Sequence, residues 1–159
     1  MTEERFTYLA QKYMDTVFRL AFSYLKCGAD ADDITQNVLL KLYRRDTPFQ
    51  SEEHVRAWLI RVTVNECRSF FRSPCRRAEP LEPFMDTLSL PSEEHADLFR
   101  AVTALSAKYR VVIHLYYFEG YPTEELARLL DVPAATVRTR MARARRLLKN
   151  YLTEADQDE

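Results

Sequence analysis

The chain has 159 residues, a hydrophobic fraction of 47% and a formal net charge of −1, so it can hold one domain or two small ones. No apolar run approaches the roughly 20 residues of a membrane span, and we expect no signal peptide at the N-terminus. The three cysteines, Cys27, Cys67 and Cys75, are widely spaced and form no CxxC pair, so neither a zinc knuckle nor a disulfide framework is indicated and reduced thiols are expected. The chain has only two glycines and a recurrent 3.6-residue period of apolar residues, which predict an all-α protein.

The N-terminal part of the chain predicts three or four helices. An amphipathic period over residues 6–24 predicts a long helix that ends near Gly28. A second helix is expected from about 30 to 45, with aspartates at its positive N-terminal end, and a third from about 52 to 72. The side chains that we expect to face inward from the second and third helices are Ile34, Val38, Leu42, Val55, Trp58, Leu59 and Val62.

The third predicted helix mixes basic and aromatic side chains. Arginines interleave with Phe70 and Phe71, a combination that suits unstacked single-stranded DNA, because bases stack on rings and phosphates seek cations. Simple core packing explains the two phenylalanines equally well, and both interpretations stay open.

A linker is predicted from Ser73 to Ser92, where four prolines interrupt any helical period. Residues 78–99 hold six acidic and no basic side chains, whereas residues 1–77 hold 13 basic and 10 acidic ones, and residues 100–150 hold 10 basic and four acidic ones. This partition indicates two nucleic-acid-facing modules on an acidic strap. The apolar linker residues, which we expect to dock on a partner or on the flanking domains, are Leu81, Phe84, Met85, Leu88 and Leu90.

The segment from Pro122 to Leu148 predicts a helix-turn-helix. Asp131-Val132-Pro133 ends its first helix and starts the second, which runs from about Ala134 to Tyr151. Between residues 134 and 150 there are six basic side chains and no acidic one, so the polar face of this helix suits the major groove. The buried stripe is expected to contain Val137, Met141, Ala144, Leu148 and Tyr151.

Four motifs together carry a family resemblance. The segments DADDITQNV (30–38), AWLIRVTVN (57–65) and LSAKYR (105–110), followed by the helix-turn-helix, resemble the extracytoplasmic-function sigma factors of bacterial RNA polymerase, group 4 of the sigma-70 family. The resemblance covers about residues 6–151. It implies two helical domains and a sigma factor that binds core polymerase and directs promoter-specific transcription initiation. It implies no enzyme activity, cofactor or metal.

The resemblance also implies a role for each segment. Residues 1–73 would be sigma region 2, 74–92 the linker, 93–153 sigma region 4 and 154–159 an acidic tail. The Arg45-to-Glu53 loop would help form the pocket for a flipped base of the −10 element. Core polymerase contacts are expected from Asp32, Asp33, Gln36, Asn37, Leu40, Lys41 and Arg44. Contacts to the −10 element are expected from Arg61, Asn65, Arg68 and Arg72. Contacts to the −35 element are expected from Arg110, Thr123, Thr136, Arg138, Thr139, Ala142, Arg143 and Arg146.

The partners implied by the resemblance are core RNA polymerase, promoter DNA and an anti-sigma factor, for a cytoplasmic monomer that does not itself insert into a membrane. The positions at which this chain departs from the family pattern are Asn37, Leu39, Ser69, Ser106 and Asp131, so the promoter consensus is not transferable from relatives. One alternative is a helix-turn-helix regulator that does not bind core polymerase as a sigma subunit. A nuclease is the other, but His54, His95 and His114 share no metal-ligand spacing.

Overall fold

The computed structural model describes the backbone of residues 1–72 and 93–157, and the side chains of residues 1–72 and 97–154. The described residues form helices and no strand, which confirms the predicted all-α class. The backbone divides into two compact units, residues 1–79 and 80–159. The predicted linker 74–92 and its apolar residues lie outside the described residues. None of the described helices has the length and apolar character to cross a membrane.

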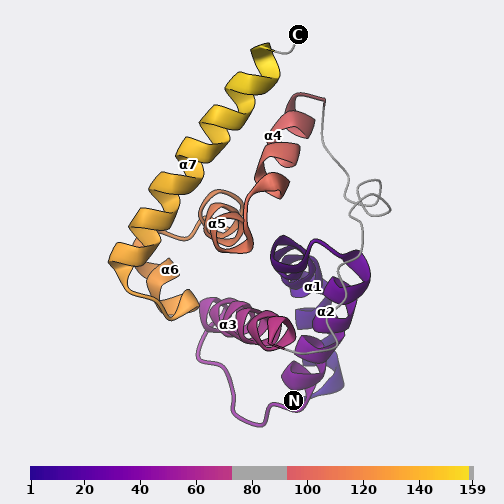
Figure 1. The fold of residues 1–159 in the computed structure, drawn as a ribbon. Helices are drawn as coiled ribbons and strands as arrows, with labels where there is room; N and C mark the ends of the chain where they lie inside the picture. Colours follow the sequence, from indigo (N-terminus) through magenta and orange to yellow (C-terminus); the bar gives the residue numbers. More distant parts are fainter. Residues whose placement is uncertain (73–92, 158–159) are drawn as a thin grey trace. The chain divides into compact units, whose positions relative to one another are not determined.

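Three helices build the N-terminal unit (Figure 1): α1 (Glu3–Leu25), α2 (Gly28–Tyr43) and α3 (Glu52–Phe71). Each packs against the other two. Their predicted apolar stripes meet in one core, since a helix in a small domain must bury its apolar face against a neighbour. The largest fully buried side chains of this core are Leu9, Val17, Leu20, Val38, Leu42, Val55, Leu59, Ile60 and Val64.

The first helix ends near Gly28 as predicted, but glycine does not cap it. Lys26 takes the left-handed conformation that ends α1, with a φ of 55°, and its N–H donates to the carbonyl of Phe22 at 2.9 Å. Gly28 is instead the first residue of α2. The left-handed conformation costs a non-glycine residue about 1 kcal/mol. Lys26 adopts it because the connection between the two packed helices is short.

The C-terminal unit contains α4 (Glu93–Ala104), α5 (Ala107–Ile113), the π-helical turn η2 (His114–Phe118), α6 (Thr123–Leu130) and α7 (Ala134–Gln157). The long α7 packs against α4, α5 and α6 (Figure 1). Leu126, Leu129 and Leu130 of α6 are buried as predicted. The apolar side chains that are buried elsewhere in the unit include Val111, Val112, Ile113, Leu115, Val137, Met141 and Ala144.

The predicted turn between α6 and α7 is confirmed. Asp131 ends α6 in the left-handed conformation, with a φ of 53°, a conformation that glycine adopts more easily than other residues. The N–H of Val132 donates to the carbonyl of Ala127 at 3.1 Å, and the carbonyl of Pro133 accepts the first hydrogen bonds of α7. The turn therefore fixes where the second helix begins.

The second helix is longer than expected, because α7 continues to Gln157 and includes part of the predicted acidic tail. Val137, Met141 and Ala144 are buried, but Tyr151 is 42% exposed, so the last position of the predicted stripe is wrong. Helical phase does not explain this exposure, because Tyr151 and the buried Met141 both lie about 40° from the direction of Val137.

The π-helical turn brings two side chains together immediately before the helix-turn-helix. The N–H of Glu119 donates to the carbonyl of His114, five residues earlier, at 3.2 Å. The His114 Nε2 and a Glu119 carboxylate oxygen lie 3.5 Å apart, and both side chains are largely buried. The His114 ring also stacks on Phe118, with 5.5 Å between ring centroids.

Candidate nucleic-acid and polymerase interfaces

One exposed face of α2 and its C-cap carries every residue predicted to contact core polymerase. These side chains alternate with the buried Ile34, Val38 and Leu42, as expected for an amphipathic helix. Leu40 is 48% exposed, which makes it a large apolar side chain within a polar surface. Lys41 also forms an ion pair with Glu66 of α3. The exposed set consists of Asp32, Asp33, Gln36, Asn37, Leu40, Lys41 and Arg44.

A second surface lies along α3. Arg61, Asn65, Arg68 and Arg72 are spaced at i, i+4, i+7 and i+11, so they share one side of the helix and its C-cap. Arg68 is half-buried and the other three are exposed. The structure therefore brings the predicted −10 residues together as a basic strip with an amide in it.

The aromatic residues of α3 are neither fully buried nor free. Phe71 packs against Tyr24 of α1, with 6.5 Å between ring centroids, and Phe70 meets Phe71 edge-on. All of Trp58, Phe70 and Phe71 are half-buried, so Trp58, which the sequence predicts to face inward, is only partly covered. Its ring instead forms part of the loop anchor described next.

The loop between α2 and α3 is held by a cation between two rings. The guanidinium carbon of Arg45 lies 4.4 Å from the centroid of Phe49 and 5.0 Å from that of Trp58. The two rings meet edge-on at 5.6 Å, and the Arg45 Nε donates to the carbonyl of Thr47 at 3.0 Å. These contacts restrict a loop that the sequence presents only as a break between helices.

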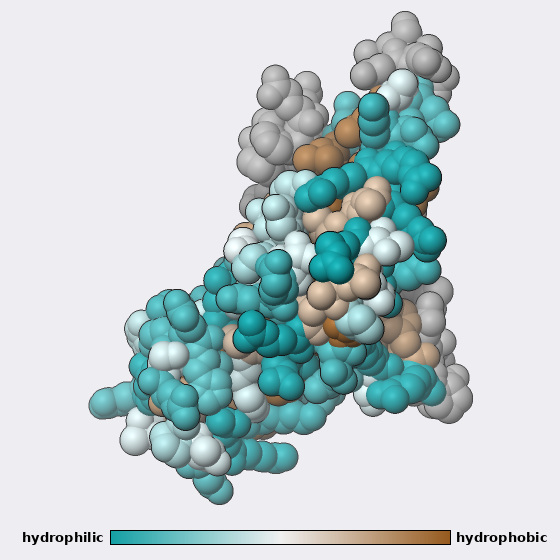
Figure 2. All heavy atoms as spheres, turned by 90° about the vertical axis from the view of Figure 1, so that its left-hand side faces the viewer, coloured by the Kyte–Doolittle hydropathy of each residue, from teal (hydrophilic) through white to brown (hydrophobic). Residues whose placement is uncertain are grey.

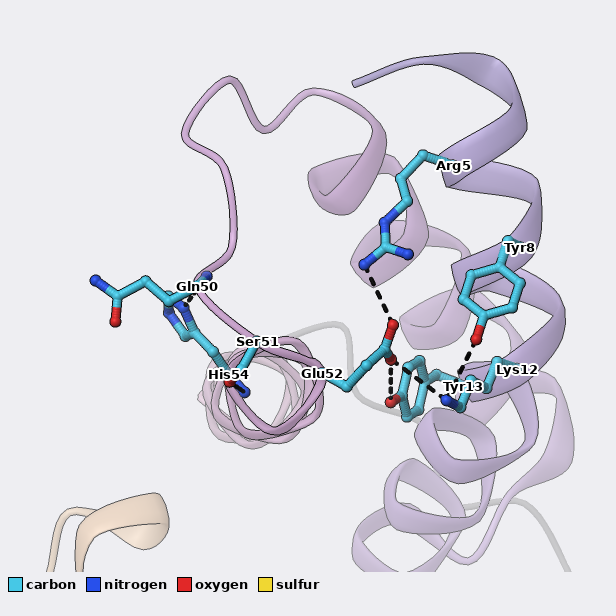
Figure 3. Close-up of polar contacts among 8 residues, drawn as sticks. All are labelled: Arg5, Tyr8, Lys12, Tyr13, Gln50, Ser51, Glu52 and His54. Carbon is cyan, nitrogen blue, oxygen red and sulfur yellow. Dashed lines mark hydrogen bonds and ion pairs between the residues drawn. The ribbon is translucent and has the colours of Figure 1, made fainter.

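The same loop ends in a capped helix start (Figure 3). The Ser51 hydroxyl accepts from the backbone N–H of His54 at 3.1 Å, which satisfies an orphan donor at the first turn of α3. The backbone N–H of Gln50 donates to the His54 Nδ1 at 3.2 Å. The His54 ring therefore ties the residue before the cap to the first turn of α3.

Glu52, the first residue of α3, is tied to α1 (Figure 3). Its carboxylate accepts a hydrogen bond from the Tyr13 hydroxyl at 2.9 Å and pairs with Arg5 at 3.2 Å and Lys12 at 3.3 Å. The Tyr13 bond is the main cause of a pKa for Glu52 below its ordinary value. No sequence pattern predicts this cluster, because 39 to 47 residues separate the partners.

The third candidate surface lies on α7, in the C-terminal unit. Arg138, Thr139, Ala142, Arg143 and Arg146 are exposed and Thr136 is half-exposed, as predicted for the polar face. The Thr139 hydroxyl donates to the carbonyl of Ala135 at 2.9 Å, which leaves its lone pairs and methyl group for other contacts. Figure 2 shows a face covered mainly by hydrophilic side chains, interrupted by small hydrophobic patches.

Arg110 must be removed from the predicted −35 contacts. It is only 6% exposed, its guanidinium donates to the carbonyl of Leu105, and burial lowers its pKa to about 10. This position contradicts a DNA contact, because a buried cation already bound to backbone cannot reach a phosphate. Thr123, the first residue of α6, is half-buried.

A shallow groove of about 350 Å³ lies between α5 and α7. Its α7 wall includes Thr136, Thr139 and Arg143 of the predicted −35 surface. The opposite wall consists of Lys108 and Tyr109, which sequence reasoning missed, although Lys108 belongs to the LSAKYR motif. No group of three His, Cys, Asp or Glu side chains within the described residues could hold a metal ion.

The sequence comparisons agree with this architecture of two units and a helix-turn-helix. The family description Sigma-70 region 2 matches residues 9–77, and Sigma-70, region 4 matches residues 95–148. The RNA polymerase sigma factor SigV of Bacillus subtilis (strain 168) is 31% identical over 142 residues, covering 87% of this chain and 86% of that protein. The ECF RNA polymerase sigma-E factor of Escherichia coli (strain K12) is 28% identical over 166 residues, covering 93% of this chain and 86% of that protein.

Solved structures show the same fold. The sigma factor RpoE from Bartonella quintana, in complex with the anti-sigma factor NepR, has a TM-score of 0.71 at 22% identity and covers 94% of this chain and 98% of that one. CnrH, in complex with the cytosolic domain of CnrY, has a TM-score of 0.64 at 27% identity and covers 98% of this chain and 91% of that one.

The matched regions define a promoter-recognition subunit of bacterial RNA polymerase. The chain belongs to the extracytoplasmic-function sigma factors of the sigma-70 family. It binds core polymerase and directs promoter-specific transcription initiation through −10 and −35 recognition. A regulator with only a helix-turn-helix is not favoured, since region 2 accounts for the N-terminal unit.

Proposed function

We propose that three exposed helix faces divide the work of this sigma factor. The α2 face contacts core polymerase, the α3 face with the α2–α3 loop contacts the −10 element, and the α7 face reads the −35 element. The observation that carries the proposal is that each predicted set lies on one accessible side of its helix, except for two −35 residues outside α7. These are Arg110 of α5, which is buried, and Thr123 of α6, which is half-buried.

The α7 face suits duplex DNA for a steric and an electrostatic reason. Thr139 and Ala142 are small and exposed, so the helix can approach the floor of a major groove closely. Arg138 and Arg143 are exposed beside them and can reach base edges or phosphates. Arginine bound to guanine in a bidentate manner contributes about 1–3 kcal/mol of discrimination.

The α3 strip suits single-stranded DNA. Arg61, Arg68 and Arg72 supply positive charge along a backbone path, and Asn65 supplies an amide that can pair with the edge of an extruded base. Extruding a base costs a few kcal/mol, which contacts from the strip and from the ordered loop must offset.

Both solved neighbours contain a bound protein: NepR, an anti-sigma factor, in one and the cytosolic domain of CnrY in the other. We infer that this chain likewise binds an anti-sigma factor and works in the cytoplasm. Similarity to two proteins of the same fold, each held by another protein, supports this inference.

The −35 assignment is tested by substituting the α7 arginines. Arg143→Ala and Arg138→Ala should each weaken binding to the promoter duplex by about 1–3 kcal/mol if the arginine contacts a base. Binding is measured on the promoter mapped by run-off transcription with core polymerase, and on a duplex with a scrambled −35 element. Arg100→Ala, which removes an exposed arginine of α4, is the matched control. Unchanged affinity of both α7 variants for both duplexes would show that this face is merely solvated.

A further inference from the structure

The groove between α5 and α7 brings together cations from two separate motifs. Its volume is about 350 Å³ and it is open to solvent along one side. One wall belongs to the proposed recognition helix, and the other belongs to a helix outside the helix-turn-helix. The polar residues that line it are Lys108, Tyr109, Thr136, Thr139, Arg140 and Arg143.

The charge in this groove has one sign. Lys108, Arg140 and Arg143 all line it, and none of the residues around it is acidic. No carboxylate in the described part of the chain forms an ion pair with any of the three. The Lys108 ammonium lies 5.1 Å from the centroid of the Tyr109 ring, which holds it against the groove wall. The positive charge of the groove therefore favours binding of an anion.

Its position relative to α7 indicates which anion. A helix in the major groove, about 12 Å wide, has a phosphate backbone on each side, and Thr139 and Arg143 of the proposed reading face form one wall of this groove. The opposite wall therefore stands where a backbone passes the recognition helix. We propose that the α5–α7 groove binds a backbone phosphate beside the −35 element, with Lys108 as its principal contact. This inference rests on the proposed function of α7.

The chemistry of lysine fits that role better than base reading. Its ammonium is a compact point charge, whereas the planar guanidinium of arginine matches two acceptors at once. A single charge on a phosphate fixes the position and orientation of the protein on the duplex and carries no sequence information. Lys108 thus sets how α7 sits in the major groove, while Arg143 and its neighbours supply the discrimination.

The test replaces Lys108 by glutamine in the full chain and measures binding to cognate and scrambled −35 duplexes over a salt series. Neutralising one phosphate contact lowers the slope of log affinity against log salt by about one, and weakens both duplexes about fivefold at 0.15 M salt. Lys108→Arg keeps the charge and should retain the slope. Arg100→Gln removes an exposed cation of α4 that does not line the groove, and should change binding to neither duplex.

Arg143→Ala separates this inference from the assignment on which it rests. If Arg143→Ala loses affinity while Lys108→Gln keeps the wild-type slope of log affinity against log salt, the groove does not bind phosphate. The assignment of α7 to the −35 element then still stands. If Lys108→Gln loses affinity for the cognate duplex alone, the proposed phosphate contact is also wrong, because Lys108 would then contact a base. If neither variant alters binding, the α7 assignment itself has failed. Far-ultraviolet circular dichroism confirms that each variant keeps its helices.

Discussion

The ordered α2–α3 loop gives a prediction that depends on the shape of one side chain. Arg45 lies against Phe49 and Trp58 and donates to the carbonyl of Thr47. Each cation–π contact at a partly exposed site contributes about 0.5–1 kcal/mol, and a charged hydrogen bond about 1.5 kcal/mol or more. The half-buried position favours the lower values, so removing the side chain should destabilise the ordered loop by about 2.5 kcal/mol. That corresponds to an affinity loss of up to about 60-fold for a ligand that requires the ordered loop.

The matched pair Arg45→Ala and Arg45→Lys tests this reasoning. Lysine keeps the charge but lacks both the planar group that stacks between the rings and the Nε donor. Both variants should therefore weaken binding of a single-stranded −10 oligonucleotide to the polymerase holoenzyme, measured by fluorescence anisotropy. Binding of the −35 duplex should stay at the wild-type level in both.

A simple phosphate contact by Arg45 would produce a different pattern. Arg45→Lys would then bind the −10 oligonucleotide like the wild-type protein, and Arg45→Ala alone would lose affinity and salt dependence. That result would refute the loop-ordering argument and assign Arg45 directly to the DNA.

Three further outcomes follow from the proposed faces. Asp33→Lys combined with Gln36→Lys should weaken binding to core polymerase in a pull-down titration, with the helical circular dichroism unchanged, and undiminished binding would place the contact elsewhere. Asn65→Ala should impair promoter melting more than −35 duplex binding, and normal permanganate reactivity at the cognate promoter would contradict its role at a flipped base. Met141→Asp should unfold the C-terminal unit, since position 141 is only 3% exposed and an unpaired carboxylate there is costly; a wild-type thermal transition of that unit would contradict the buried stripe.

The exposed faces could be predicted because helical periodicity separates buried from exposed positions within one element. Ile34, Val38 and Met141 are buried as that periodicity requires. Arg110 shows the limit of this reasoning, since its residue type suggested DNA while the packing of α5 buries it. The anchors of Arg45 and Glu52 could not be predicted, because contacts between different elements leave no period in the sequence.

The π-helical turn before α6 has a consequence for insertions and deletions. Such a turn is equivalent to one extra residue in an α-helical ladder, and residues five apart in a regular α-helix point about 140° away from each other. The wider winding is what lets His114 face Glu119 across 3.5 Å. Deleting one residue between His114 and Phe118 would restore regular winding, and because the wide turn already absorbs the extra residue, the chain after it would keep nearly the same direction. The five-residue segment therefore lets the helix-turn-helix keep its direction after a one-residue deletion, whose main effect would be to separate His114 from Glu119.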